Sequence, residues 1–357
     1  MALVPFIPGG WATFAAGAVF VTLAPPYSIF RSRGSGRYAG RWNRLLVLRP
    51  YWYLILTLLL LGPLALVGAA VGGLGWGRPV SGEQVALIAG GVFLVVMFLV
   101  GYIDSRRLTT RHLTVTLPEL PTEFDGFRIA QISDLHVGPQ TSTSFLAEVA
   151  RRVREAEADI IVVTGDLVDD FAPDAELYAA ALGDLAAPEG VYVIPGNHDI
   201  YAGWPEVRSR LERLPLTVLV NDVHVLTRGN ASLAVLGTGD PAAGDGGTPA
   251  GAPEIGRALG QVPDGICTVA LAHNPALWPP LAHAGVALTL SGHTHYGQFA
   301  LPRLGWSLAT PFLRHSMGVY REGRSWLYIN PGTNYWGIPF RLGTPPEVTV
   351  VELRKTE

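Results

Sequence analysis

Uncharged apolar stretches dominate the first third of the chain. Residues 1–30 and 51–77 contain no charged side chain. An α-helix needs about 20 apolar residues to cross the core of a bilayer. We therefore predict that residues 1–105 form a membrane region with about three transmembrane helices, near residues 8–27, 51–75 and 85–103. The first stretch is the weakest, because Gly, Ala and Pro dilute it, and its alternative interpretation is a signal peptide.

Basic residues predict how this region would be oriented. The segment between the first two apolar stretches contains no acidic residue and six arginines, Arg31, Arg33, Arg37, Arg41, Arg44 and Arg49. Loops rich in Lys and Arg remain in the cytoplasm. The sequence thus predicts a multi-pass protein of the inner (cytoplasmic) membrane, with the lipid bilayer as a partner and with the residues after 104 in the cytoplasm.

Short apolar runs separated by turn signals begin near His112 and predict a second domain over residues 113–357. The runs rich in Val, Ile and Leu are typical of buried strands: Arg128–Ser133, Ile160–Thr164, Val191–Pro195, Leu233–Gly237, Thr268–Ala272, Ala287–Ser291, Trp326–Asn330 and Glu347–Leu353. Amphipathic helices are predicted at Ser144–Ala158, Ala175–Ala187 and Leu277–Ala284. Strands that alternate with helices indicate a mixed α/β domain whose functional groups gather at the carboxyl ends of strands.

The net charge argues against nucleic-acid binding, and the cysteine content excludes a fold held by internal disulfides. The net charge of −3 gives no electrostatic field that would attract nucleic acid. The one cysteine, Cys267, excludes an internal disulfide framework and lies in an apolar run that is typical of a buried thiol.

Five short polar clusters follow the predicted strands. They read D-L-H at 134–136, G-D at 165–166, G-N-H-D at 196–199, A-H-N at 272–274 and G-H-T-H at 292–295. Ionisable side chains beside apolar strands are costly to bury unless they are paired or bind a metal. Carboxylate, amide and imidazole groups together are the ligands that two adjacent divalent metals need.

Spacing assigns a role to each candidate ligand. Asp134 and His136 leave one strand end together and, with His295, would bind the first metal. Asp166 is the predicted bridging carboxylate. The second metal would be bound by Asn197, His273 and His293. The two cofactor ions are predicted to be Mn, Fe, Zn, Co or Ni, and a hydroxide between them would attack phosphorus.

Two further residues of the third cluster are predicted to take part in catalysis. His198 directly follows the ligand Asn197, so it would point at the site without binding a metal. We predict that it stabilises the transition state or protonates the leaving oxygen. Asp199 would orient the His198 imidazole through its other ring nitrogen.

The order D-x-H, G-D, G-N-H-D, H, G-H-x-H closely resembles the calcineurin-like metallophosphoesterases over residues 125–353. The nearest likeness is to the membrane-associated, YkuE-like bacterial branch, through G-H-T-H-Y-G-Q at 292–298 and P-F-R-L-G-T-P-P-E at 339–347. The resemblance implies a four-layer αββα sandwich, with two mixed sheets flanked by helices, and the ligand roles given above. Tyr296 and the segment Asn330–Tyr335 differ from the usual sequence of that branch. These differences would alter the substrate site and not the metal ligands.

The predicted activity is metal-dependent hydrolysis of a phosphoester or pyrophosphate bond. The favoured phosphorylated substrate is a membrane lipid or lipid-linked nucleotide, because the membrane region would tether the site near the bilayer. The alternatives are a general cytoplasmic phosphodiesterase or phosphatase that is only anchored, and a scaffold without activity. Arg341 fits either a substrate anion or an ion pair with Glu347, and Trp306, Trp326 and Trp336 are predicted to lie in the core.

Overall fold

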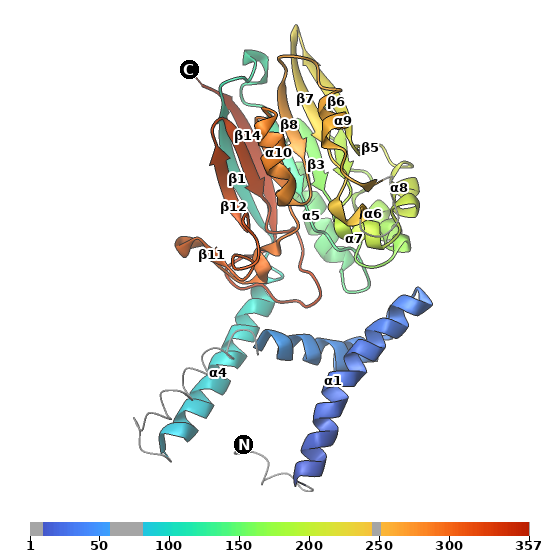
Figure 1. Cartoon of the computed structure of the whole chain (residues 1–357), viewed down its shortest axis with the longest axis vertical. Coiled ribbons are helices and arrows are strands. Elements are labelled where there is room, and N and C mark those ends of the chain that lie inside the picture. The colour runs from blue at the N-terminus through green and yellow to red at the C-terminus, as the bar shows by residue number, and fades with distance from the viewer. Residues whose placement is uncertain (1–9, 58–80, 245–250, 357) are drawn as a thin grey trace. The chain divides into compact units, whose positions relative to one another are not determined.

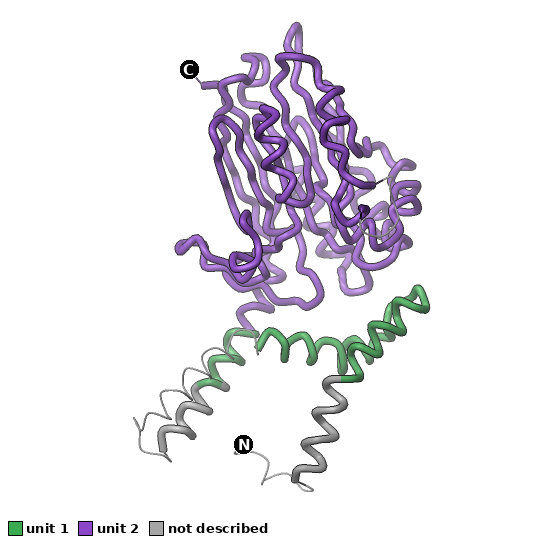
Figure 2. The backbone as a smooth tube through the Cα atoms, in the orientation of Figure 1, with its two compact units in different colours: residues 1–98 green, residues 99–357 purple. Residues whose placement is uncertain are grey.

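The chain divides into two compact units, residues 1–98 and 99–357 (Figure 2). The computed structural model describes residues 10–57, 81–244 and 251–356. In the first unit, the Oγ atom of Ser28 in α1 donates to the Oδ1 atom of Asn43 in α2 at 2.7 Å. The helical elements that begin in this unit include α1 (Gly10–Ser35), α2 (Arg41–Asn43), the π-helix η2 (Arg44–Leu48) and α4 (Ser81–Asp104), which continues past residue 98.

The prediction of a membrane region is not supported by the structure. Across the described ranges, no helix combines the length and the apolar character that crossing a bilayer requires. In α1 the apolar residues are diluted and interrupted by Pro25 and Pro26. The predicted helix at 51–75 falls largely outside the described residues. The three transmembrane helices and the multi-pass inner-membrane location are therefore not supported, and neither is the orientation deduced from them.

Two six-stranded sheets form the second unit (Figure 1). The first sheet has the order β1-β14-β2-β3-β4-β5 and is parallel except between β14 and β2. Its strands are β1 (Thr109–Leu117), β14 (Glu347–Lys355), β2 (Arg128–Ile132), β3 (Ile160–Thr164), β4 (Val191–Ile194) and β5 (Thr217–Val218).

The second sheet has the order β12-β13-β9-β8-β7-β6 and is antiparallel only at its two outer pairs. Its strands are β12 (Gly318–Glu322), β13 (Ser325–Ile329), β9 (Leu288–Ser291), β8 (Cys267–Leu271), β7 (Ala231–Gly237) and β6 (Asp222–Arg228). A separate hairpin consists of β10 (Ala300–Leu301) and β11 (Trp306–Ser307).

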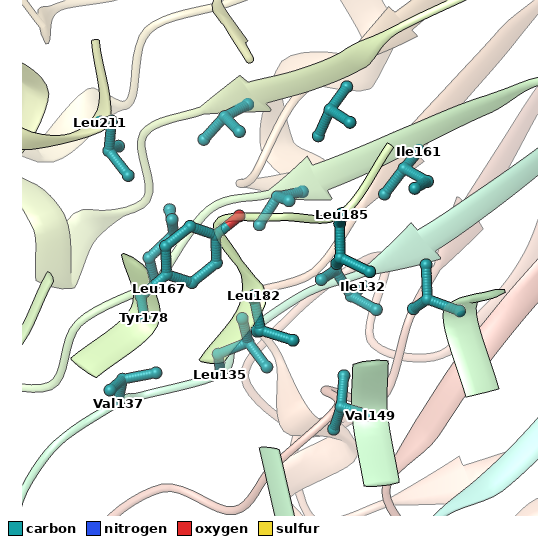
Figure 3. Packing of buried hydrophobic residues seen from close by; sticks show 14 of the residues in the cluster. Ile132, Leu135, Val137, Val149, Ile161, Leu167, Tyr178, Leu182, Leu185 and Leu211 are labelled. Atoms are coloured by element: carbon teal, nitrogen blue, oxygen red, sulfur yellow. The ribbon is translucent and has the colours of Figure 1, made fainter. Parts of the chain in front are cut away.

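Alternating side chains of the first sheet divide between two hydrophobic cores. On β3, Ile160 and Val162 face the second sheet, whereas Ile161 and Val163 face the helices. Figure 3 shows part of the helix-side core, which includes Ile132 and Ile161 of the sheet and Val149 and Tyr178 of the helices. The helices that cover this face are α5 (Thr143–Glu155), α6 (Ala175–Leu182), α7 (Asn197–Tyr201) and α8 (Trp204–Leu211).

The outer face of the second sheet is covered by α9 (Ile255–Leu259) and α10 (Trp278–His283). Leu236 and Ala270 of the sheet pack there with Ala258 and Leu281 of the helices. The order of layers is thus helix, sheet, sheet, helix. Short 3-10 helices complete the unit: η3 (Thr122–Phe124), η4 (Ala172–Asp174), η5 (Pro241–Ala243), η7 (Pro275–Leu277), η8 (His295–Gln298) and η9 (Pro302–Leu304).

All eight predicted strands are confirmed to within about two residues, and so are the positions of the three predicted helices. The helix predicted to run to Ala187 instead ends at Leu182, because Gly183 follows it and weakens the helix. Strands β1, β5, β6 and β12 of the two main sheets were not predicted. Among them, β1 and β6 are edge strands that carry exposed polar residues, such as His112 and Asp222, so their sequences lack an apolar run.

Candidate metal centre

All seven predicted ligands lie at one end of the two sheets. Asp134 and His136 follow β2, and Asp166 follows β3. Asn197 begins α7, three residues after the end of β4. His273 follows β8, while His293 and His295 follow β9. Because β2, β3 and β4 run parallel in one sheet and β8 and β9 in the other, their carboxyl ends bring these loops together.

The first group of ligands is Asp134, His136 and His295. One ligand atom from each lies within 4.8 Å of the others. The Nε2 atoms of His136 and His295 are 3.0 Å apart, and Nε2 of His295 is 3.3 Å from Oδ1 of Asp134. Burial holds the pKa of both imidazoles well below the usual value. The two rings are therefore neutral and bring ring nitrogens to one point, as ligands of a cation would.

Asn197, His273 and His293 form the second group. The Oδ1 atom of Asn197 lies 2.8 Å from Nδ1 of His293 and 3.2 Å from Nε2 of His273. The Nδ1 atom of His273 is 2.8 Å from the carbonyl of Thr164. Donation of the Nδ1 proton to that carbonyl leaves Nε2 to face the group, which is how ligating histidines are usually oriented.

Asp166 lies between the two groups. Its Oδ2 atom is 3.6 Å from Nε2 of His136 in the first group and 3.3 Å from Nε2 of His273 in the second. Its Oδ1 atom accepts a hydrogen bond from the backbone N–H of His198 at 2.8 Å. Burial alone would raise the pKa of Asp166, but His273 holds it well below the usual value, so this carboxylate is charged.

Strained backbone accompanies these side chains. Five of the seven candidate ligands have positive φ angles that non-glycine residues rarely adopt: Asp134 (52°), His136 (40°), Asp166 (52°), His293 (73°) and His295 (48°). Each such residue costs of order 1–3 kcal/mol and persists where the surrounding structure or function demands it. The donor set of carboxylate, amide and imidazole atoms fits divalent Mn, Fe, Zn, Co or Ni.

His198 is positioned by a different residue from the one predicted. Its Nδ1 atom lies 2.6 Å from the backbone carbonyl of Asp169, which leaves Nε2 as the ring nitrogen available to a substrate. Asp199 does not contact the imidazole. Its fully buried carboxylate accepts from the backbone N–H groups of Leu167, Val168 and Gly196 at 2.9–3.1 Å. The predicted orienting role of Asp199 is therefore wrong, because these three donors draw its side chain away from the site.

Asp169 was missed from the sequence. Burial and the neighbouring carboxyl of Asp170 raise the pKa of Asp169 to about 7. Its Oδ1 atom is 3.7 Å from Nδ1 of His136, so Asp169 contacts both a candidate ligand and His198. The available signal was the carboxylate three residues beyond Asp166 in G-D-L-V-D, in the same loop after β3.

Arg341 and Trp336 also differ from expectation. Arg341 is fully buried and donates to the carbonyl of Pro331 at 2.6 Å. Its other terminal nitrogen is 3.0 Å from Nδ1 of His295, so it adjoins the ligands and forms no ion pair with Glu347. Trp336, predicted to lie in the core, is 44% exposed, and its ring centroid is 5.9 Å from that of His198.

Gly165 permits a close approach of two loops at the centre. Its φ is +87°, and a Cβ atom there would lie 2.8 Å from Cα of Gly196 and 2.6 Å from Nδ1 of His273. We expect Gly165→Ala to lower the free energy of unfolding by about 2–4 kcal/mol, through overpacking added to the cost of the left-handed backbone. Denaturant titration of the metal-free protein measures this.

Gly229→Ala is the matched control for that substitution. Gly229 also has a positive φ, +60°, but a Cβ atom there would meet nothing within 4 Å. The free energy of unfolding of Gly229→Ala should therefore fall only by the cost of the left-handed backbone, about 1–2 kcal/mol. Equal losses in the two variants would show that the close packing around Gly165 contributes nothing to stability.

Comparisons with known proteins agree with this geometry. The family model for calcineurin-like phosphoesterase matches residues 127–297. The metallophosphoesterase YkuE of Bacillus subtilis is 30% identical over 71% of this chain and 88% of its own length. A transmembrane protein with metallophosphoesterase domain from Danio rerio is 31% identical over 68% of this chain, which spans 56% of that protein.

Among solved structures, the crystal structure of TT1561 from Thermus thermophilus is similar, with a TM-score of 0.40 and 16% identity over 57% of this chain and 88% of that chain. The family model matches the part of the chain that carries all five polar clusters. The chain belongs to the calcineurin-like phosphoesterase family, whose members are hydrolases that act on phosphoester bonds and typically bind divalent metals.

Proposed function

We propose that the chain hydrolyses a phosphoester or pyrophosphate bond with two divalent cations. Asp134, His136 and His295 would bind one ion, and Asn197, His273 and His293 the other. The observation that carries this proposal is the position of Asp166, whose Oδ2 atom faces Nε2 of His136 at 3.6 Å and Nε2 of His273 at 3.3 Å. A single carboxylate oxygen placed between two sets of ligands is what a pair of cations about 3.5–4 Å apart needs as a bridge.

When bound, the two cations would acidify a water molecule between them to supply the hydroxide nucleophile and would neutralise the phosphoryl oxygens. The residues of the chain supply orientation and a proton. Asp166 also accepts from the backbone of His198, so the bridging carboxylate fixes the start of α7. His198, held at Nδ1 by the Asp169 carbonyl, would donate a proton from Nε2 to the departing oxygen.

A lipid-linked substrate was favoured from the sequence because the predicted membrane helices would hold the site near the bilayer. Since those helices are not supported, the preference for a lipid-linked substrate loses its basis. Phosphodiester hydrolysis itself rests on the metal centre and does not depend on the anchor. A lipid-linked and a soluble phosphodiester therefore belong side by side in the same assay, and their relative kcat/KM values decide between the two substrate classes.

Metal titration tests the dinuclear proposal. Chelator-treated protein should bind two Mn²⁺ per chain by calorimetry and regain hydrolysis of bis(p-nitrophenyl) phosphate. Metal at about 100 times its Kd should also stabilise the fold by about 2.7 kcal/mol for each occupied site, which raises Tm in a thermal scan. A stoichiometry of one, or full activity with chelator present, would contradict the proposal.

A further inference from the structure

Two exposed aromatic rings lie beside the candidate proton donor. The ring centroids of Tyr201 and Trp336 are each 5.9 Å from the centroid of His198, with interplanar angles of 66° and 70°. The two side chains are 66% and 44% exposed. Single exposed aromatics need no explanation, but these two come from separate segments and contact the same imidazole.

Both rings are tied to the metal centre by their own segments. Tyr201 is the last residue of α7, the helix that begins at the candidate ligand Asn197. Trp336 is held by Gln298, three residues beyond the candidate ligand His295. The Gln298 amide accepts from the backbone N–H of Trp336 at 2.9 Å and donates to its carbonyl at 3.0 Å. The segment that carries the indole is therefore anchored before any substrate arrives, which limits the entropy lost on binding.

The charges around His198 restrict what can bind there. Asp169 and Asp170 each place a carboxylate oxygen within 4.8 Å of a ring nitrogen of His198. A second phosphate or another anionic group on the departing side of a substrate would be repelled by the carboxylate of Asp170. An uncharged flat ring would instead contact two aromatic side chains. Such contacts are favourable for a nucleobase or an aryl group, whichever base or substituent the ring carries.

We propose that Tyr201 and Trp336 form a subsite for an uncharged flat ring carried by the leaving group of the substrate. The subsite rests on the proposed hydrolase function, since it lies next to the group that would protonate the departing oxygen. It narrows the substrate class to phosphoesters of aromatic or nucleoside-like alcohols and disfavours a pyrophosphate whose leaving group is itself an anionic phosphate.

Turnover of two matched diesters tests this subsite. Methyl phenyl phosphate and methyl hexafluoroisopropyl phosphate have leaving groups of similar acidity, one flat and one compact. In Trp336→Leu, the ratio of kcat/KM for the phenyl ester to that for the fluoroalkyl ester should fall about tenfold, within the range measured for loss of one stacking contact. Trp336→Phe should retain most of the ratio. Phe312→Leu, at a residue that is 79% exposed and outside the site, should leave the ratio unchanged.

Equilibrium binding separates failure of the subsite from failure of the hydrolase function. Metal-loaded protein should bind benzylphosphonate more tightly than cyclohexylmethylphosphonate in calorimetry, and Trp336→Leu should remove that preference. If the preference is present but neither ester turns over, the hydrolase function is wrong and the subsite stands. If the wild type shows no preference, or if Trp336→Leu lowers both kcat/KM values equally, the subsite is overturned.

Discussion

Replacing Asp166 with asparagine should lower kcat/KM for an aryl phosphodiester by about 10³-fold or more, the upper range for loss of one charged group that stabilises a transition state. The amide preserves the shape of the side chain, including the oxygen that accepts from the His198 backbone at 2.8 Å. It removes the negative charge that faces His136 and His273 from either side. Two cations without that bridging charge would repel each other across a short distance.

Metal content shows whether the loss has this cause. Mass spectrometric metal analysis of Asp166→Asn should give one ion per chain or fewer, against two for the wild type. Asp184→Asn is the matched control, because that carboxylate pairs with Arg154 on the surface and its side chain is 76% exposed. The control should retain both metals and full turnover. An Asp166→Asn protein with two metals and unchanged kcat/KM would remove the central argument for a shared carboxylate.

The candidate ligands could be predicted from the sequence because each of them directly follows a strand or begins the helix after one. Ile160–Thr164 is a short run rich in β-branched residues, which is typical of a buried strand, and Asp166 follows its end. Parallel strands align their carboxyl ends, so the separate clusters were expected to meet. The strands predicted from the local sequence are the strands that the fold aligns side by side. For this reason, seven candidate ligands separated by up to 161 positions lie at one edge of the sandwich.

Residues placed by long-range packing could not be predicted in the same way. Trp336 lies in a loop, and its backbone is hydrogen-bonded to the side chain of Gln298, a residue 38 positions away in the sequence. Arg341 reaches His295 across a separate turn. For Asp199, adjacency in the sequence suggested a partnership with His198. On a helix, however, successive side chains point in different directions, and the carboxylate of Asp199 instead accepts from the backbone of Gly196 at the start of the helix.

The membrane prediction failed for a related reason. An apolar composition over about 20 residues predicts a spanning helix only if those residues form one continuous apolar helix. The described part of the first predicted stretch belongs to α1, which contains Pro25 and Pro26 and has Arg33 in its last turn. Composition alone did not distinguish that arrangement from a transmembrane helix.

Replacement of His198 by alanine is expected to separate proton donation from metal binding. We expect kcat for methyl phenyl phosphate to fall about 10²–10⁴-fold, the usual contribution of a positioned general acid. The loss should be much smaller for methyl p-nitrophenyl phosphate, because p-nitrophenolate departs readily without a proton. Since the imidazole is held by the Asp169 carbonyl and not by the predicted ligands, the variant should still bind two metals.

The alternative role for His198 is that of a metal ligand, since its ring also lies within 4.8 Å of ligand atoms of His136 and Asp166. In that case His198→Ala would lose an ion, and turnover of the phenyl and p-nitrophenyl esters would fall by the same factor. His112→Ala, at an exposed position of β1, is the control and should change neither metal content nor the ratio of the two rates. Metal content and the dependence on the leaving group together decide the role of His198, because loss of a proton donor with both metals retained penalises a poor leaving group selectively.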